Sequence, residues 1–123
     1  MQFMQHGPLK LKAQLYCGEE IAMGPGKADL LDAIDREGSI SAAARAMGMS
    51  YRRGWMLVDS MNRCWTEKLV ETAAGRSGAQ LTPCGKAVLT HYRALQRAMA
   101  ELTGHADYAA LAHLLRDHPA IKE

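Results

Sequence analysis

The stretch "SAAARAMGMSYRRGW" (Ser41–Trp55) places a run of alanines, a glycine and a pair of arginines within fifteen residues. Small alanine side chains let a neighbouring helix approach closely, and glycine adopts the left-handed conformation that reverses a chain at little cost. Ser50 is a preferred residue for the N-cap of a helix. The pattern predicts two helices, over residues 40–47 and from 51 to about 62, that turn at Gly48.

Two short helices joined by a glycine-containing turn form a helix-turn-helix. At about 100° per residue, the second helix turns Gly54, Trp55 and Val58 toward the core, and we expect Trp55 to be the anchor. The opposite face then carries Arg52, Arg53, Met56, Asp59, Ser60 and Arg63. Arginines in the first turn of such a helix meet base edges in the major groove of DNA. The second helix is therefore predicted to be a recognition helix.

The residues before this motif predict a hairpin and a helix. "LKLKAQLYC" (Leu9–Cys17) alternates apolar and polar residues, which is typical of a half-buried strand. The chain then turns at "GEE" into a short second strand, "IAMG". "KADLLDAIDREG" follows as a helix that ends at Gly38, and Ser39 caps the first helix of the motif.

The residues after the motif predict a wing and a long helix. Two short strands, Leu69–Thr72 and Ala79–Leu81, flank a loop in which Arg76 lies between glycines. This order is that of a winged helix, and Arg76 is expected to contact DNA backbone at the tip of the wing. Thr82 and Pro83 then open a helix that reaches residue 102 or 103, and Asp107 caps a last short helix.

The predicted fold is mainly α with small β hairpins: a winged helix-turn-helix with a long C-terminal helix. We expect an N-terminal tail (1–8), a winged helix-turn-helix DNA-binding domain (9–103) that includes a dimerisation helix (82–103), and a short C-terminal helix and tail (104–123). Apolar side chains recur along the long helix at spacings of 4, 3, 4 and 3, at Val88, Tyr92, Leu95, Met99 and Leu102. This stripe predicts the seam of a homodimer, although it could also pack on the domain's own core.

The positive charge of the chain is concentrated in its middle. The 123 residues carry a net charge of +2, but residues 36–97 hold ten Lys or Arg side chains against four Asp or Glu. Such a distribution fits a polyanionic partner. The three cysteines form no C-x-x-C pair and no apolar run of 18 residues occurs. We therefore expect a cytoplasmic protein without a membrane span, metal or cofactor.

The run "GSISAAARAMGMSYRRGWMLVDSMN", with "LVE", "GRSGAQLTPCGKAVL" and "YRALQ" after it, resembles the N-terminal DNA-binding domain of the molybdate-responsive ModE regulators over about residues 9–97. It is similar, more loosely, to the LysR-type winged helix. The resemblance implies a bacterial or archaeal transcription factor that binds a palindromic operator as a homodimer. It also implies that Ser50, Tyr51, Arg52 and Arg53 open the recognition helix.

The sequence departs from the family pattern in two places. The segment "TAAGRSGAQLT" is shorter and poorer in glycine than the usual wing. Members of the family continue into molybdate-binding domains, whereas about twenty residues follow the matching region here. We therefore expect no molybdate binding by this chain alone.

Two other classes of function, an enzyme and a protein-interaction adaptor, fit the sequence less well than DNA binding. An enzyme is disfavoured because Ser39, Ser41 and the five histidines form no recognised catalytic motif. A winged helix that acts as a protein-interaction adaptor would favour an apolar or acidic recognition helix, and this one is basic. The residues expected to contact double-stranded DNA are Ser41, Ser50, Tyr51, Arg52, Arg53, Met56, Arg63 and Arg76.

Overall fold

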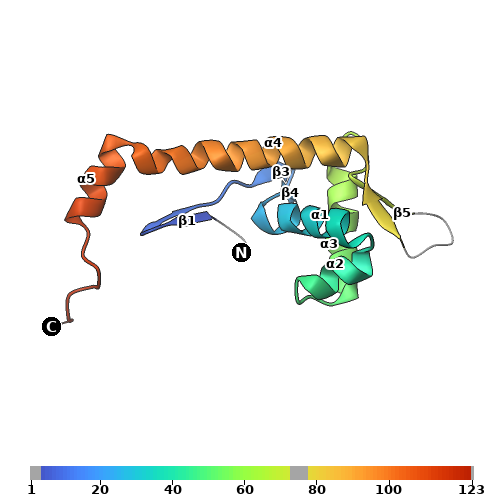
Figure 1. Cartoon of the computed structure of the whole chain (residues 1–123), viewed down its shortest axis with the longest axis horizontal. Helices are drawn as coiled ribbons and strands as arrows, with labels where there is room; N and C mark the ends of the chain where they lie inside the picture. Colours follow the sequence, from blue (N-terminus) through green and yellow to red (C-terminus); the bar gives the residue numbers. More distant parts are fainter. Residues whose placement is uncertain (1–3, 73–77, 123) are drawn as a thin grey trace.

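Five α-helices and three antiparallel hairpins make up the described residues, 4–72 and 78–122, of the computed structural model (Figure 1). The strands are β1 (Met4–His6), β2 (Leu9–Leu11), β3 (Leu15–Cys17), β4 (Glu20–Met23), β5 (Val70–Thr72) and β6 (Ala79–Leu81). The helices are α1 (Pro25–Glu37), α2 (Ile40–Ala46), α3 (Tyr51–Cys64), α4 (Pro83–Ala100) and α5 (Ala106–Leu114), with a 3-10 turn (Glu101–Gly104) before α5. The strands pair β1 with β2, β3 with β4, and β5 with β6. The fold predicted from the sequence is confirmed.

Side-chain caps set the ends of the helices in the motif. The Ser39 hydroxyl oxygen accepts a hydrogen bond from the Ala42 amide at 3.0 Å at the start of α2. Ser50 does the same for the Arg53 amide at 3.1 Å at the start of α3. Gly38, which follows α1, has a φ of 80°, a conformation that side chains rarely adopt. The predicted caps and the predicted glycine stop are confirmed.

The small residues of the motif bring α2 and α3 together. Ala43, Ala44 and Gly54 are buried where the two helices cross. A Cβ atom on Gly54 would lie 3.0 Å from the Cβ of Ala44, which is tighter than ordinary van der Waals contact. A bulkier side chain at either position would therefore push the helices apart. This confirms that Ala44 serves helix packing, whereas Ala46, which was predicted to do the same, is exposed.

The core lies around α1, between α3, the β5–β6 hairpin and α4. Its largest fully buried side chains are Met23, Leu30, Leu31, Ile34, Met61, Leu69 and Val70. They come from α1, from α3 and from the strands β4 and β5 together with the residue before β5. Removing apolar surface of this kind from water is the dominant favourable contribution to folding. The same packing fixes the orientation of α3.

The end of α3 is bonded to the start of the β5–β6 hairpin by one side chain. The Asn62 carbonyl oxygen accepts from the backbone amides of Leu69 and Val70 at 2.9 and 3.1 Å, and its amide group donates to the Val70 carbonyl at 3.0 Å. Thr82 continues this junction into α4, since its hydroxyl caps Gly85 and donates to the Lys68 carbonyl. The hairpin therefore has a fixed position relative to the recognition helix.

Two neighbouring side chains of α4, Tyr92 and Arg93, bond this helix to the rest of the domain. The Arg93 guanidinium donates to Asp29 at 2.8 Å and to Asp32, both on α1. Burial alone would lower the pKa of Arg93, but its hydrogen bonds with Asp32 and Asp29 raise it. The Tyr92 hydroxyl donates to the Ala13 carbonyl at 2.8 Å. Tyr92 therefore packs on the core of its own domain. This is the alternative to a dimer seam that the sequence left open for the apolar stripe.

The N-terminal residues differ from the prediction. The single strand expected over residues 9–17 is two strands, β2 and β3, that belong to different hairpins. Ala13 lies between the two strands, and its backbone carbonyl accepts a hydrogen bond from the Tyr92 hydroxyl. Met4–His6, expected in a tail, pairs with β2 across a turn at Gly7, whose φ is 58°. The β1–β2 hairpin contacts α5, since the Tyr108 hydroxyl donates to the His6 carbonyl at 3.2 Å.

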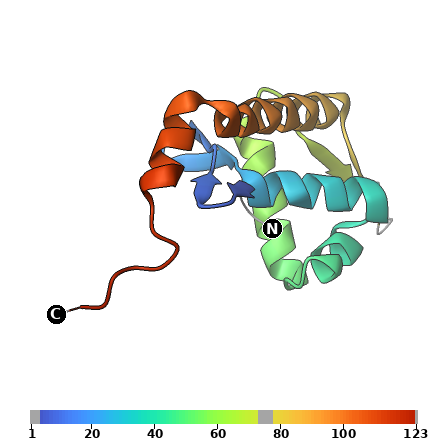
Figure 2. The ribbon, with the colours of Figure 1, turned by 60° about the vertical axis from the view of Figure 1, so that its left-hand side comes forward.

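The C-terminal elements also differ in detail. Helix α4 ends at Ala100, and the 3-10 turn carries the chain on to Gly104. The side chain that caps α5 is His105, which accepts from the Asp107 amide, whereas Asp107 itself lies in the first turn. Figures 1 and 2 show α4 running the length of the molecule, with α5 at the end farthest from α2 and α3. Among the described residues, no helix has the length and apolar character needed to span a membrane.

Candidate nucleic-acid interface

Helix α3 has one buried and one exposed face. Gly54, Val58 and Met61 are buried against the domain. The side chains that face solvent are Tyr51, Arg52, Arg53, Trp55, Met56, Asp59 and Arg63, and Ser60 is half-buried. The first two turns of α3 therefore project from the domain with basic and apolar groups, as a recognition helix must.

Arg52 and Arg53 lie in the first turn of α3, directly after its N-cap Ser50. Both are exposed, and within residues 4–72 and 78–122 neither guanidinium has a hydrogen bond or ion pair. A guanidinium carries five N–H donors in a planar fork that matches a guanine edge or a phosphate. The two side chains are thus available for an anionic or acceptor-rich ligand.

Arg63, at the other end of α3, is engaged differently. It pairs with Asp59 at 3.1 Å and with Glu20 of β4 at 3.4 Å. The Ser60 hydroxyl, and then Arg63, hold the pKa of Glu20 below its ordinary value of 4.5. The charge of Arg63 is already balanced by two carboxylates. Arg63 therefore has less unbalanced positive charge available for a phosphate than Arg52 and Arg53 have.

A small polar cluster fastens the end of α3 to the β3–β4 hairpin. The Cys64 thiol donates to the Glu20 carboxylate at 3.6 Å, and Cys17 is the cross-strand neighbour of Glu20. Burial, followed by the neighbouring Cys17 thiol, raises the pKa of Cys64. The Trp65 indole nitrogen donates to the Ala22 carbonyl at 3.1 Å just beyond the helix. The far end of the recognition helix is thus held by both hydrogen bonds and packing.

The expectation that Trp55 anchors α3 in the core is wrong. Its side chain is 45% exposed, and the partly buried Trp65 packs against the core instead. The buried face is set by Gly54, where α3 touches α2 and an added Cβ would lie 3.0 Å from the Cβ of Ala44. Trp55 follows Gly54 by about 100° around the helix and so points outward. The sequence pattern placed the indole on the same side of the helix as Gly54 and Val58, and it gave no signal for Trp65.

The other residues predicted to contact DNA come from α2, from the N-cap of α3, from α3 itself and from the segment between β5 and β6. Ser41 is exposed in the first turn of α2, where its hydroxyl accepts from Arg45 at 3.5 Å. Ser50 uses its oxygen as the cap of α3 but keeps its hydroxyl proton to donate. Tyr51 and Met56 are exposed on the helix surface. Arg76 lies outside the described residues.

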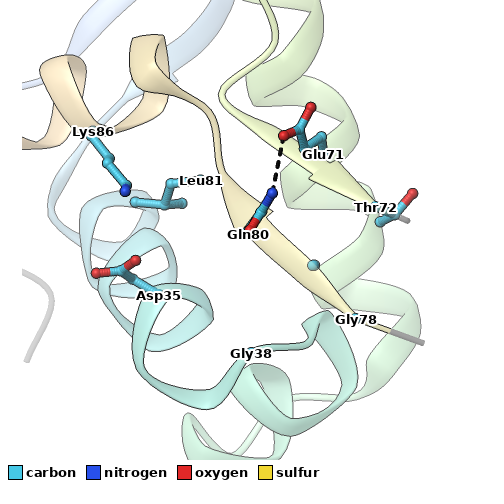
Figure 3. Close-up of a pocket in the computed structure, with 9 residues that line it drawn as sticks. Asp35, Gly38, Glu71, Thr72, Gly78, Gln80, Leu81 and Lys86 are labelled. Atoms are coloured by element: carbon cyan, nitrogen blue, oxygen red, sulfur yellow. Dashed lines mark hydrogen bonds between the residues drawn. The ribbon is translucent and has the colours of Figure 1, made fainter. Parts of the chain in front are cut away.

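The end of the β5–β6 hairpin at which Thr72 pairs with Ala79 is fixed against the turn between α1 and α2. The Ala79 amide donates to the Gly38 carbonyl at 2.9 Å, and Gln80 donates to Glu71 across the hairpin at 3.2 Å. Figure 3 shows the depression beside this junction, with Asp35 and Lys86 on the side opposite Glu71. The depression mixes acidic and basic groups. The hydrogen bond between Ala79 and Gly38 therefore helps to set the direction of the two strands relative to the helices.

Three helices, a hairpin and a long following helix, with a basic and solvent-exposed third helix, define a winged helix-turn-helix domain. This is the DNA-binding domain of a class of transcriptional regulators. Residues 27–86 match the family described as "Bacterial regulatory helix-turn-helix protein, lysR family". Residues 27–86 are therefore similar to the helix-turn-helix of that family, and the predicted resemblance to ModE is confirmed by the relatives below.

Sequence relatives include ModE regulators and molybdenum-pterin-binding proteins. The chain is 42% identical over 83 residues to the molybdenum-pterin-binding protein MopB of Rhodobacter capsulatus, covering 65% of this chain and 31% of that protein. It is 41% identical over 78 residues to the molybdenum transport protein ModE of Azotobacter vinelandii, covering 61% and 29%. Over 84 residues it is 37% identical to the DNA-binding transcriptional dual regulator ModE of Escherichia coli K12, covering 68% and 28%. The chain spans about a third of the length of these relatives.

A solved structure has the same fold. The crystal structure of the CbnR_DBD–DNA complex superimposes with a TM-score of 0.52 at 21% identity, covering 73% of this chain and 97% of that chain. The full-length CbnR structure with target DNA gives a TM-score of 0.50 at 22% identity, covering 71% and 28%. At this level of identity the likeness establishes the arrangement of helices and hairpin.

Proposed function

We propose that the chain binds double-stranded DNA sequence-specifically, as a homodimer on a palindromic operator, and regulates transcription there. The observation that carries this proposal is the pair of guanidinium groups of Arg52 and Arg53, on the first turn of the exposed α3, which have no hydrogen bond or ion pair within residues 4–72 and 78–122. A helix fits the major groove of B-DNA, and arginine bonds the O6 and N7 atoms of guanine with two hydrogen bonds. The protein then acts in the cytoplasm, where bacterial chromosomal DNA lies.

The other predicted contacts complete the proposed interface. Ser50 and Tyr51 enter the groove beside the arginines at the N-terminus of α3, where the backbone amides and the helix dipole favour phosphate. Ser41 reaches phosphate from α2. Arg63, with its charge balanced by carboxylates, contributes a weaker backbone contact. We propose that Arg76, which lies between β5 and β6 in the sequence, contacts phosphate as well.

Binding to duplex DNA that weakens steeply with salt tests the proposal. Each phosphate neutralised by a cationic side chain releases counterions, so log K falls with log salt by about 0.9 per contact. We expect the purified chain to bind a fluorescent genomic fragment at low salt and to release it as salt increases. A protein-interaction adaptor or an enzyme would show no such binding. Absence of salt-dependent binding in an anisotropy titration would exclude a DNA-binding function.

The proposed dimer uses the outward side of α4 and the 3-10 turn that follows it. Leu95 is 45% exposed and Leu102 is 47% exposed, although Tyr92 and Val88 of the same stripe pack on the domain's core. Leu95 also borders an apolar groove between α4 and the β3–β4 hairpin, which Leu15 and Trp65 help to line. Two copies that cover these leucines remove apolar surface from water. A two-fold dimer then presents its recognition helices to half-sites about 34 Å apart.

Replacing Leu95 and Leu102 together by glutamate is expected to dissociate the dimer. The change puts carboxylates where apolar side chains would meet, whereas both positions are exposed in the single chain and tolerate charge. Leu111→Glu, on the exposed α5, makes the same chemical change away from the stripe and is the control. Sedimentation at tens of micromolar should show a dimer for the wild type and the control, and a monomer for the double variant. A monomeric wild type would contradict the proposed assembly.

The names of several relatives refer to molybdenum, but the matched region covers only about a third of those proteins. No group of three or more His, Cys, Asp or Glu side chains is placed to hold a metal among residues 4–72 and 78–122. We propose that these residues bind DNA and a second copy of the chain, without catalysis and without binding molybdate.

A further inference from the structure

The recognition helix carries an apolar patch that the core does not use. Tyr51 is 53% exposed, Trp55 is 45% exposed and Met56 is 62% exposed. With Arg52 they line one depression on the outer face of α3. These three residues, the Trp55 patch, lie away from the face that Gly54, Val58 and Met61 bury. Adjacent apolar side chains left exposed in this way mark an interaction site.

The groups around the Trp55 patch define the charge of its partner. Arg52 and Arg53 flank the patch, and neither has a partner in the described part of the chain. The acidic residue beside it, Asp59, is already paired with Arg63 at 3.1 Å. The exposed charge next to the patch is therefore positive. Its partner must be anionic and must also present apolar groups within a few ångströms of its charged or polar edge.

Duplex DNA has one such apolar group in its major groove, the C5-methyl of thymine. We propose that Trp55, with Tyr51 and Met56, contacts thymine methyl groups and so determines a preference for A·T pairs beside the base that Arg52 or Arg53 reads. This inference rests on the DNA-binding function proposed above. It adds Trp55, which the sequence predicted to lie in the core, to the residues that contact DNA.

The dimensions of the helix suit this contact. Tyr51 and Trp55 are one turn apart on α3, which at 1.5 Å per residue is about 6 Å. Successive base pairs rise by about 3.4 Å, so the patch spans roughly two base-pair steps. Met56 is four residues from Arg52 and lies on the same side of the helix. One helix face can therefore present the methyl contact and the guanidinium to neighbouring base pairs.

Deoxyuridine in place of thymine tests the proposal, because it removes the methyl group and leaves the hydrogen-bonding edge unchanged. The probe is a duplex selected by the wild type from random sequence, prepared with thymine or with deoxyuridine in both half-sites. Losing one buried methyl weakens binding about fourfold, so two half-sites lose roughly 15-fold. We expect Trp55→Ala to bind both duplexes equally and Trp55→Phe to keep most of the discrimination.

Emission from Trp55 provides a second readout. In the Trp65→Phe variant, Trp55 is the one remaining tryptophan of the sequence, and its emission should change when the selected duplex is added. Binding of the selected duplex without discrimination between thymine and deoxyuridine would overturn the inference and leave the proposed function intact. A Trp55→Ala variant with altered sedimentation but unchanged discrimination would assign the patch to a second protein copy instead. If the wild type binds no duplex, both proposals fail.

Discussion

Alanine at both Arg52 and Arg53 is expected to weaken operator binding more than any other surface change, by about 2–6 kcal/mol, or roughly 30-fold to 10⁴-fold. The range follows from about 1–3 kcal/mol for each lost contact to a base. Both guanidinium groups lack a partner in the described parts of the free protein, so their removal leaves no buried charge uncompensated. The fold should survive, and the loss should appear in binding alone.

The single variants separate base reading from phosphate contact. Arg52→Ala and Arg53→Ala are compared by anisotropy on operator and on scrambled DNA across a salt series, with the exposed Arg116→Ala, beyond α5, as control. A base contact weakens operator binding selectively, whereas a phosphate contact weakens both duplexes and lowers the salt slope by about one ion. If both variants weaken the two duplexes equally, the arginines contact only phosphate. Ser50, Tyr51 and Met56 would then be the next candidates for reading sequence.

Gly85→Ala is expected to cause the largest loss of stability. A Cβ atom at this position would lie 2.1 Å from the Leu69 carbonyl oxygen, and this obstacle is backbone, which cannot rotate away. Inserting one methyl group into a packed site costs about 1–3 kcal/mol and occasionally more, and this contact should cost about 3 kcal/mol or more. Because Gly85 lies in the first turn of α4, the variant also displaces the helix that we propose for dimerisation.

Gly104→Ala is the matched control, because a Cβ there would meet no atom within 4 Å. Urea denaturation of the two variants and the wild type gives the change in the free energy of unfolding. The control should lie within about 0.5 kcal/mol of the wild type, as surface substitutions usually do. Equal stability of both variants would show that α4 does not pack on Leu69 as described.

The parts of the fold that depend on local chemistry could be predicted from the sequence. Ser39, Ser50 and Thr82 each bond a backbone amide three residues ahead, so the signal and its effect lie within one turn of chain. Gly38 is also a local signal, because its own backbone adopts the left-handed conformation that ends α1. The boundaries of the helices in the motif were accordingly predicted well.

Features that depend on distant partners could not be predicted. Arg93 pairs with Asp29, 64 positions earlier, and Tyr92 bonds Ala13, 79 positions earlier. Trp55 was misplaced for a related reason: its apolar character is visible in the sequence, but the crossing of α2 at Gly54 that turns it outward is not. Within the candidate site, the outward direction of Arg52 and Arg53 was predicted, and the exposed indole beside them was missed.

Selection of bound sequences from a pool of random duplexes is the most direct test of sequence-specific recognition by α3. The wild type should enrich an inverted repeat whose half-sites lie about 34 Å apart, with guanine at one or more positions of each half-site. The Arg52→Ala and Arg53→Ala variants should lose preference at those guanines. Recovery of unenriched sequence by a wild-type protein that still binds DNA would contradict sequence-specific recognition by this helix.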